Sequence, residues 1–139
     1  MPDDLKIASL VDDSSDQEYV EYPDIPGFRV LFGPPDNPQQ VRIATRTLRQ
    51  EEAVDRGAEY HYLTVQEYVA GWEGLKVADL PKLLPGKKLK LEGVEETAEL
   101  AFNPDNRAFL LQKSRPFFTW CNAQVNAREE QEAADSKNS

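Results

Sequence analysis

The chain is poor in the residues that most often build reactive or metal-binding centres. Its 139 residues include one cysteine, Cys121, and one histidine, His61, so an internal disulfide is excluded and no cysteine–histidine zinc site is expected. The carboxylates show no calcium-loop spacing, no apolar run approaches the ~20 residues of a membrane-spanning helix, and residues 1–10 lack a signal-peptide pattern. These gaps predict an intracellular protein without metal, cofactor or membrane contact.

Positive charge is also scarce, and the deficit lies at the two ends. Lys and Arg total 16 against 25 Asp and Glu, a net charge of -9. Residues 1–24 hold one basic and eight acidic residues, and residues 128–139 hold two and four. Nucleic-acid binding draws on clustered Lys and Arg, so no nucleic-acid partner is expected. We predict a flexible acidic N-terminus over 1–16, one domain over 17–127, and a polar acidic tail over 128–139.

The order of turn formers and apolar residues predicts a mainly α fold of the α+β class. Residues 19–22 and 28–32 are rich in aromatic and β-branched side chains, and 23–27 is a cluster of turn formers between them. A lone hairpin is marginal in water, so it must lie on other elements. We therefore expect an N-terminal β-hairpin packed on about four helices.

The first helix is expected over residues 37–57. Asn37 reads as its N-cap, Pro38 fits the first helical position, and Gly57 marks its end. The spacing predicts that Val41, Ala44 and Leu48 face inward, with arginines outward.

The second helix is expected to end near Trp72, with its start open between Ala58 and a capping box at Thr64. Its apolar residues follow three- and four-residue steps. They are Tyr62, Val65, Tyr68, Val69 and Trp72. Residues 75–101 show the least clear helix or strand pattern in the chain. Within them, apolar and charged residues alternate over 88–92, as they would in a short strand.

Two further helices are expected near the C-terminus. Asn103 and Pro104 repeat the cap-plus-proline signal, with Leu110 and Leu111 facing inward, and Ser114 marks a break. The last helix carries one stripe that runs into the acidic tail. The stripe is Phe117, Trp120, Cys121, Gln124 and Val125.

No set of residues has the spacing of a catalytic site. No residue near His61 or Cys121 in the sequence could orient its side chain for catalysis. We therefore predict a partly exposed histidine and a small core cysteine. Gly86-Lys87 lacks the earlier glycine and the following Ser or Thr of a phosphate-binding loop, and the glutamates at 95–99 read as a solvated face. We expect no enzyme.

Four large aromatic side chains are the candidate partner-binding residues. Trp72, Phe117 and Trp120 are expected to be mainly core. Phe118 lies about 100° around the helix from Phe117, so it either packs against the hairpin or is an exposed anchor for a partner. The Trp72 helix end and the last helix are the segments predicted to bind a partner.

Several local patterns, taken in order, resemble the tail assembly chaperones of long-tailed bacteriophages and prophages. They are the hairpin at 19–30, the proline-preceded, arginine-rich helix at 37–56, Val69-Ala70-Gly71-Trp72-Glu73-Gly74-Leu75, the cap at 102–106, and the polar endings at 126–130 and 137–139. Residues 75–101 depart from the family, which has a brief turn there.

The resemblance implies a non-catalytic role in the host bacterial cytoplasm. Such proteins bind the long, helical tape-measure protein, keep it soluble until tail tube protein polymerises around it, and are absent from the mature virion. Chaperones of this kind often ring or coat a client, so the resemblance also implies homo-oligomers. Two alternatives stay open: a structural or adaptor protein that remains in the tail, and an acidic regulator that blocks a DNA-binding partner.

Overall fold

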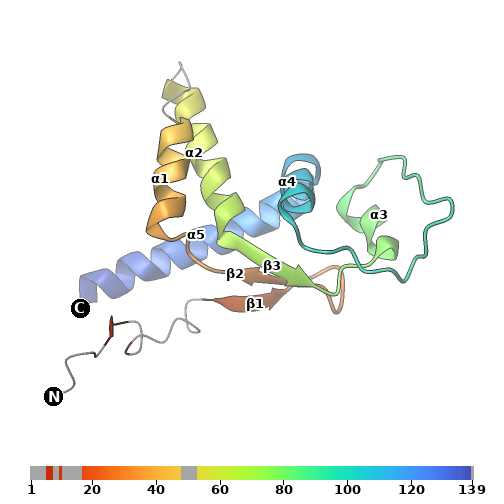
Figure 1. Ribbon diagram of the computed structural model, residues 1–139, viewed down its shortest axis with the longest axis horizontal. Coiled ribbons are helices and arrows are strands. Elements are labelled where there is room, and N and C mark those ends of the chain that lie inside the picture. The colour runs from red at the N-terminus through yellow and green to blue at the C-terminus, as the bar shows by residue number, and fades with distance from the viewer. Residues whose placement is uncertain (1–5, 8–9, 11–16, 48–52, 139) are drawn as a thin grey trace.

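A three-stranded antiparallel sheet and five helices make up the computed structural model, which describes residues 6–7, 10, 17–47 and 53–138 (Figure 1). The strands are β1 (Glu18–Glu21), β2 (Arg29–Phe32) and β3 (Val69–Glu73), in the order β1-β2-β3. The helices are α1 (Asn37–Thr47), α2 (Ala53–Tyr68), α3 (Leu80–Leu83), α4 (Pro104–Lys113) and α5 (Arg115–Asn138). The predicted α+β class and N-terminal hairpin are confirmed.

Strand β3 occupies the place where a helix end was predicted. The β2–β3 register shifts between Leu31 and Phe32, which leaves Ala70 as the extra residue of a bulge. Val69 and Trp72 therefore both turn to the buried side of the sheet although they are three residues apart. Because three-residue spacing is also helical spacing, the prediction of a helix through Trp72 was wrong.

The cap of α1 lies one residue before the predicted position. The backbone N–H of Gln39 donates to Asp36 Oδ1 at 2.9 Å, and the N–H of Asp36 donates to Gln39 Oε1 at 2.7 Å. This reciprocal pair is a capping box, so Asp36 and not Asn37 is the N-cap, and Pro38 takes the second helical position.

The inner face of α1 also differs from the prediction. Ile43 and Thr47 are buried, whereas Val41 and Ala44 are exposed; Leu48 lies outside the described residues. Figure 1 shows α1 and α2 standing side by side and projecting away from the sheet, so α1 buries only a narrow stripe. The predicted end at Gly57 was wrong, because Gly57 lies inside α2.

The segment between β3 and α4 is mostly irregular. A single 3-10 turn, Val77–Asp79, leads into α3, and the chain then loops round to return beside its own start. On the return, the N–H of Leu100 donates to the carbonyl of Leu75 at 2.7 Å. Residues 88–92 are not a strand, because Gly93, at φ 77, turns the chain before any ladder forms.

Helices α4 and α5 meet at a sharp corner at Ser114, the break that the sequence predicted. Asn103 caps α4 as predicted, since its Oδ1 accepts the N–H of Asn106 at 2.8 Å. Leu110 and Leu111 are buried, as expected.

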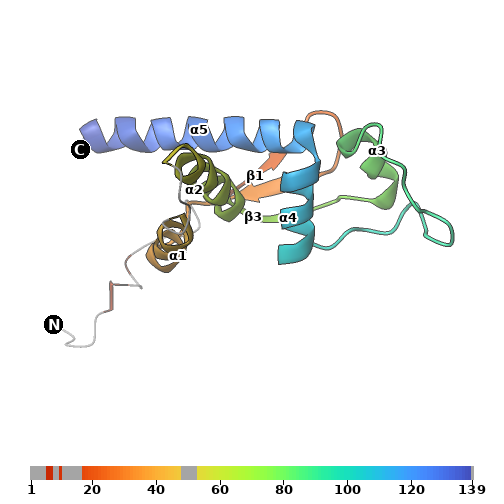
Figure 2. The same ribbon diagram turned by 90° about the horizontal axis from the view of Figure 1, so that it is seen from above.

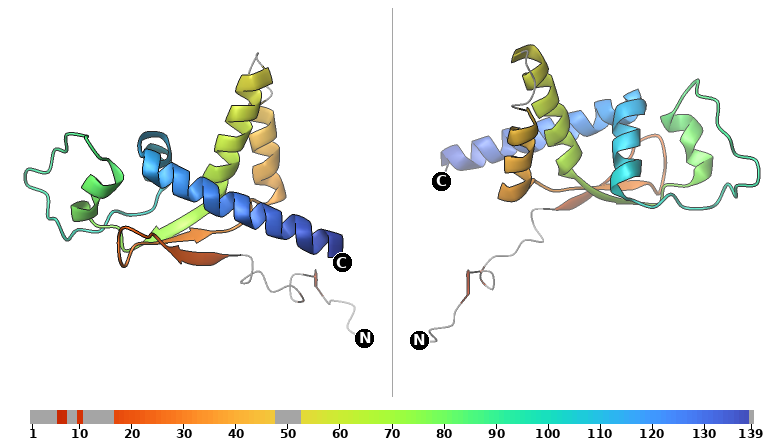
Figure 3. Two further views of the ribbon diagram at one scale, coloured as in Figure 1. Left: turned by 180° about the vertical axis from the view of Figure 1, so that it is seen from behind. Right: turned by 45° about the horizontal axis from the view of Figure 1, so that its top comes forward.

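Helix α5 crosses one face of the sheet and continues without a break to Asn138, so the polar ending is helical through that residue (Figures 2 and 3). Its buried stripe of Phe117, Cys121 and Val125 meets the sheet residues whose side chains point the same way. Those residues include Phe28, Val30, Phe32, Val69 and Trp72. Within the described helices, none is long and apolar enough to cross a membrane.

Candidate functional site

The four predicted aromatic residues lie mainly in or beside the core. Phe117 is fully buried, and its ring packs against Phe28 with centroids 6.1 Å apart. Trp120 is half-buried and meets Tyr22 edge-on at 5.0 Å. Trp72 is 8% exposed. Among them, Phe117 has no surface to offer a partner in this conformation.

Phe118 takes neither of the two placements expected for it. Its ring stacks on Tyr62 of α2, with centroids 6.0 Å apart and an interplanar angle of 20°. It is half-buried and joins α5 to α2, not to the hairpin. Phe118 therefore mainly stabilises the packing of α2 against α5.

The two candidate nucleophilic or basic residues face different ways. Cys121 points into the core, and burial raises the pKa of its thiol. His61 is exposed on α2, where its Nε2 lies 2.6 Å from Asn122 Oδ1. No metal-binding group of three or more His, Cys, Asp or Glu residues occurs in the part of the chain that the structure describes.

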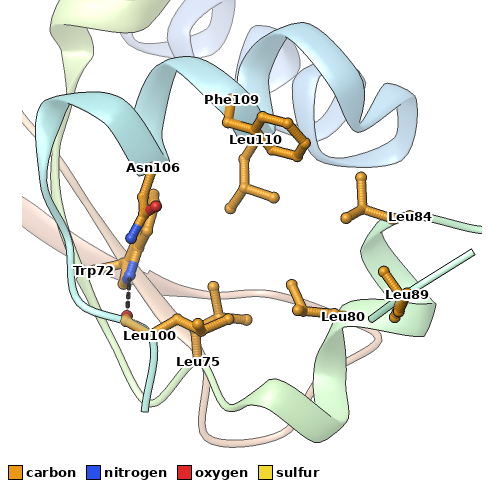
Figure 4. Close-up of a pocket in the computed structure, with 9 residues that line it drawn as sticks. All are labelled: Trp72, Leu75, Leu80, Leu84, Leu89, Leu100, Asn106, Phe109 and Leu110. Carbon is orange, nitrogen blue, oxygen red and sulfur yellow. Dashed lines mark hydrogen bonds between the residues drawn. The ribbon is translucent and has the colours of Figure 1, made fainter. Parts of the chain in front are cut away.

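An apolar pocket lies between β3, α3 and α4, in the region that the sequence left unassigned (Figure 4). Its volume is about 240 Å³. Its walls are six leucines together with Trp72, Asn106 and Phe109. The leucines are Leu75, Leu80, Leu84, Leu89, Leu100 and Leu110. For scale, an engineered cavity of about 150 Å³ lined by such side chains binds benzene.

Hydrogen bonds fix the wall of the pocket that faces the sheet. The indole Nε1 of Trp72 donates to the carbonyl of Leu100 at 2.9 Å (Figure 4). The side-chain amide of Asn106 donates to the carbonyl of Ala101 at 2.8 Å. Both bonds tie the returning loop to the sheet and to α4, so this wall is held in place before any ligand binds.

The opposite wall is more open. Phe109 projects from α4 beside Leu110 and is 53% exposed, although it is a large apolar side chain (Figure 4). Leu84 and Leu89 face it across the pocket, from the end of α3 and the loop that follows. Burying such a side chain is worth about 1.5–3 kcal/mol, so an exposed Phe109 is a source of binding energy for a partner.

Lysines surround the Leu84–Leu89 side of this pocket. Lys82, Lys87, Lys88 and Lys90 are all exposed. Across the described part of the chain, no carboxylate is ion-paired with any of these four. The glutamates of 95–99 belong to the other side, where the carbonyl of Glu96 accepts the N–H of Ala78 at 3.0 Å.

A second hollow lies between α1, α2 and α4, and its polar side chains are paired with one another. The side-chain amide of Gln39 donates to Glu67 Oε2 at 2.9 Å, and Arg107 lies 3.6 Å from the other oxygen of that carboxylate. Arg46 pairs with Glu59 at 3.2 Å. These groups hold the helices together, so the apolar pocket is the stronger candidate site.

Sequence reasoning found Trp72 but missed the rest of the pocket. Its leucines lie in residues 75–110 at spacings that follow neither a helix nor a strand. The available signal was the number of leucines in residues 75–100, for which no helix was predicted. The chain matches no protein-family model, no characterised protein and no solved structure.

Proposed function

We propose that this protein is a non-catalytic holding protein that binds an apolar segment of a helical client. The client implied by the resemblance is the tape-measure protein, bound in the host bacterial cytoplasm until tail tube protein replaces the holder. The observation that carries the proposal is the apolar pocket with Phe109 exposed at its edge. A helix that presents bulky side chains at three- and four-residue steps can place one in such a pocket.

The proposal moves the client contact from the last helix to α4. Trp72 keeps a role as one wall of the pocket, while Phe117, Phe118 and Trp120 support the elements behind it. The acidic ends suit a holder, because a surplus of one charge sign keeps a complex with an apolar client in solution.

Co-expression with a tape-measure protein tests this function. We expect wild-type protein to keep the client in the soluble fraction, and Phe109→Asp to release it. Losing the burial of one large apolar side chain weakens binding by about 10- to 100-fold. Val41→Asp is the matched control, because Val41 is 63% exposed on α1, outside the pocket.

Two outcomes would contradict the proposal. The first is a Phe109→Asp variant that holds the client as well as wild type. The second is the presence of the protein in stoichiometric amounts in purified virions, measured by mass spectrometry. That second result supports the structural or adaptor alternative instead.

An acidic regulator of a DNA-binding protein remains the second candidate, on one observation. Helix α5 carries exposed Glu129, Glu130 and Glu132 on a folded element, as such a mimic requires. It predicts that Glu129→Gln/Glu130→Gln/Glu132→Gln abolishes partner binding while Phe109→Asp leaves it intact. The holding function predicts the reverse.

A further inference from the structure

One copy of the chain contains two apolar features that it does not bring together. The first is the pocket, whose Leu84–Leu89 side is bordered by lysines without carboxylate partners among the described residues. The second is the N-terminal segment, in which Ile7 is 79% exposed and Leu10 is 68% exposed. Covering exposed apolar side chains of this size with a second surface is energetically favourable.

The charges of the two features are opposite. Residues 1–16 contain five aspartates and one lysine, a net charge of -4, around the apolar residues. Residues 76–90 contain five lysines and one aspartate, a net charge of +4, in a chain whose total is -9. An acidic, apolar segment therefore fits the lysine-bordered side of the pocket in both chemistry and sign.

We propose that the segment around Ile7 and Leu10 of one copy binds in the apolar pocket of a second copy. Their side chains fill the space between Phe109 and Leu84, and the neighbouring aspartates lie toward the lysines of residues 82–90. The protein is then self-associating, with the N-terminal segment as donor and the pocket as acceptor.

The path of the chain favours a second copy as the acceptor. Gln17 packs against Gly33, whose N–H donates to the carbonyl of Tyr68 at 2.9 Å. The N-terminal segment therefore joins the fold at the Tyr68 end of the sheet, and the pocket lies beyond the opposite end of β3. In Figure 1, β1 begins at the end of the sheet that lies away from α3.

Sedimentation of the full chain over a range of concentrations tests the contact. We expect a mass that rises from the monomer value of 15.8 kDa with concentration. Ile7→Ser/Leu10→Ser removes the donor, and Phe109→Asp damages the acceptor, so each variant is expected to be a monomer. Val41→Asp, outside both features, is expected to associate as wild type does.

Mixing the two monomeric variants tests directly whether the segment of one copy binds the pocket of another. The donor-defective chain keeps an intact pocket, and the pocket-defective chain keeps an intact segment, so an equimolar mixture should form a heterodimer through one contact. Ile7→Ser/Leu10→Ser removes two large side chains and should weaken the contact by about 100-fold or more, and Phe109→Asp removes one and should weaken it by about 10- to 100-fold. Failure of the mixture to associate would overturn the proposal.

The electrostatic part has its own control pair. Lys87→Gln/Lys88→Gln is expected to weaken association by about fivefold at low salt, an effect that salt screens away. Glu95→Gln/Glu96→Gln changes the same number of charges on the other side of the pocket and is expected not to weaken association. Equal weakening by both pairs would contradict the proposed orientation of the segment.

Three further results would also overturn the inference. They are a wild-type protein that stays monomeric at all concentrations, a mass that neither variant changes, and a segment that protects its own pocket in a monomer. None of these concerns a client, so self-association and the holding function fail separately. If both hold, client and N-terminal segment compete for one pocket, and Ile7→Ser/Leu10→Ser should raise client affinity.

Discussion

Replacing the buried serine at the α4–α5 corner should lower the stability of the fold by an amount that can be calculated from its two hydrogen bonds. Ser114 is fully buried, and its Oγ does two things at once. It accepts the backbone N–H of Phe117 at 3.3 Å, as the N-cap of α5, and it donates to the carbonyl of Leu83 in α3. Ser114→Ala removes one oxygen and therefore both bonds.

The two losses add to an unusually large cost for so small a change. Deleting an N-cap side chain costs about 1 kcal/mol. Leaving the Leu83 carbonyl without its donor inside the protein costs about 1–3 kcal/mol more. We therefore expect Ser114→Ala to lower the free energy of unfolding by about 2–4 kcal/mol, out of about 5–15 kcal/mol for a domain of ordinary stability.

Asn103→Ala is the matched control, since Asn103 caps α4 in the same way but from an exposed position. Urea unfolding followed by far-ultraviolet circular dichroism gives both free energies. We expect about 1 kcal/mol for the control, so that the difference between the two variants measures the buried bond to Leu83. If Ser114→Ala costs no more than Asn103→Ala, the reasoning about the buried carbonyl is wrong.

The remaining predictions concern two glycines and one tyrosine. Gly74 has φ 76, and a Cβ there would overlap the carbonyl of Gly27, so Gly74→Ala should cost at least about 2 kcal/mol in urea unfolding. Gly57→Ala, in open space inside α2, should stabilise by about 1 kcal/mol instead, and a loss would contradict this. Burial and then the Glu132 carboxylate raise the pKa of Tyr68 to about 12, so the unfolded chain loses that proton first as pH rises above 10. Unfolding free energy should therefore fall between pH 10 and 12 by at most about 1.4 kcal/mol per pH unit, and less in Tyr68→Phe; equal slopes would refute this.

Local signals predicted the parts of the fold that local energies decide. The cap at Asn103, the break at Ser114 and the stripe of α5 depend on residues within one or two turns, and the structure has them all. The cap of α1 was misplaced by one residue, because Asp36 and Asn37 are both good caps and only the reciprocal bond to Gln39 distinguishes them.

Tertiary contacts decided the elements that the sequence did not predict. Residues 69–73 become a strand because β2 has a free edge with which they pair. The bulge at Ala70 allows Val69 and Trp72, three residues apart, to face the same side of the sheet. The exposed face of α1 follows from its projection away from the sheet, which no local pattern records. Val41 is therefore outside and Ile43 inside.

The pocket was beyond prediction for the same reason. Its walls come from a strand, a four-residue helix, a loop and α4, and hydrogen bonds that join the returning loop to Leu75 and Trp72 help to hold them together. A periodicity search compares neighbours in sequence, whereas Leu80 and Phe109 are neighbours only in space. The exposed aromatic on α4 becomes informative once the leucines opposite it are known.

Trp72 belongs both to the hydrophobic core and to the wall of the pocket. It meets Phe117 edge-on at 6.3 Å on the core side and Phe102 at 5.0 Å near the returning loop. A ligand in the pocket therefore rests on the same ring that supports the core, and because the pocket exists only in the folded chain, binding there adds to global stability by mass action. Truncating Trp72 would damage fold and site together. Phe109 is the residue that separates them, since it contributes to the pocket from an exposed position and leaves the core intact.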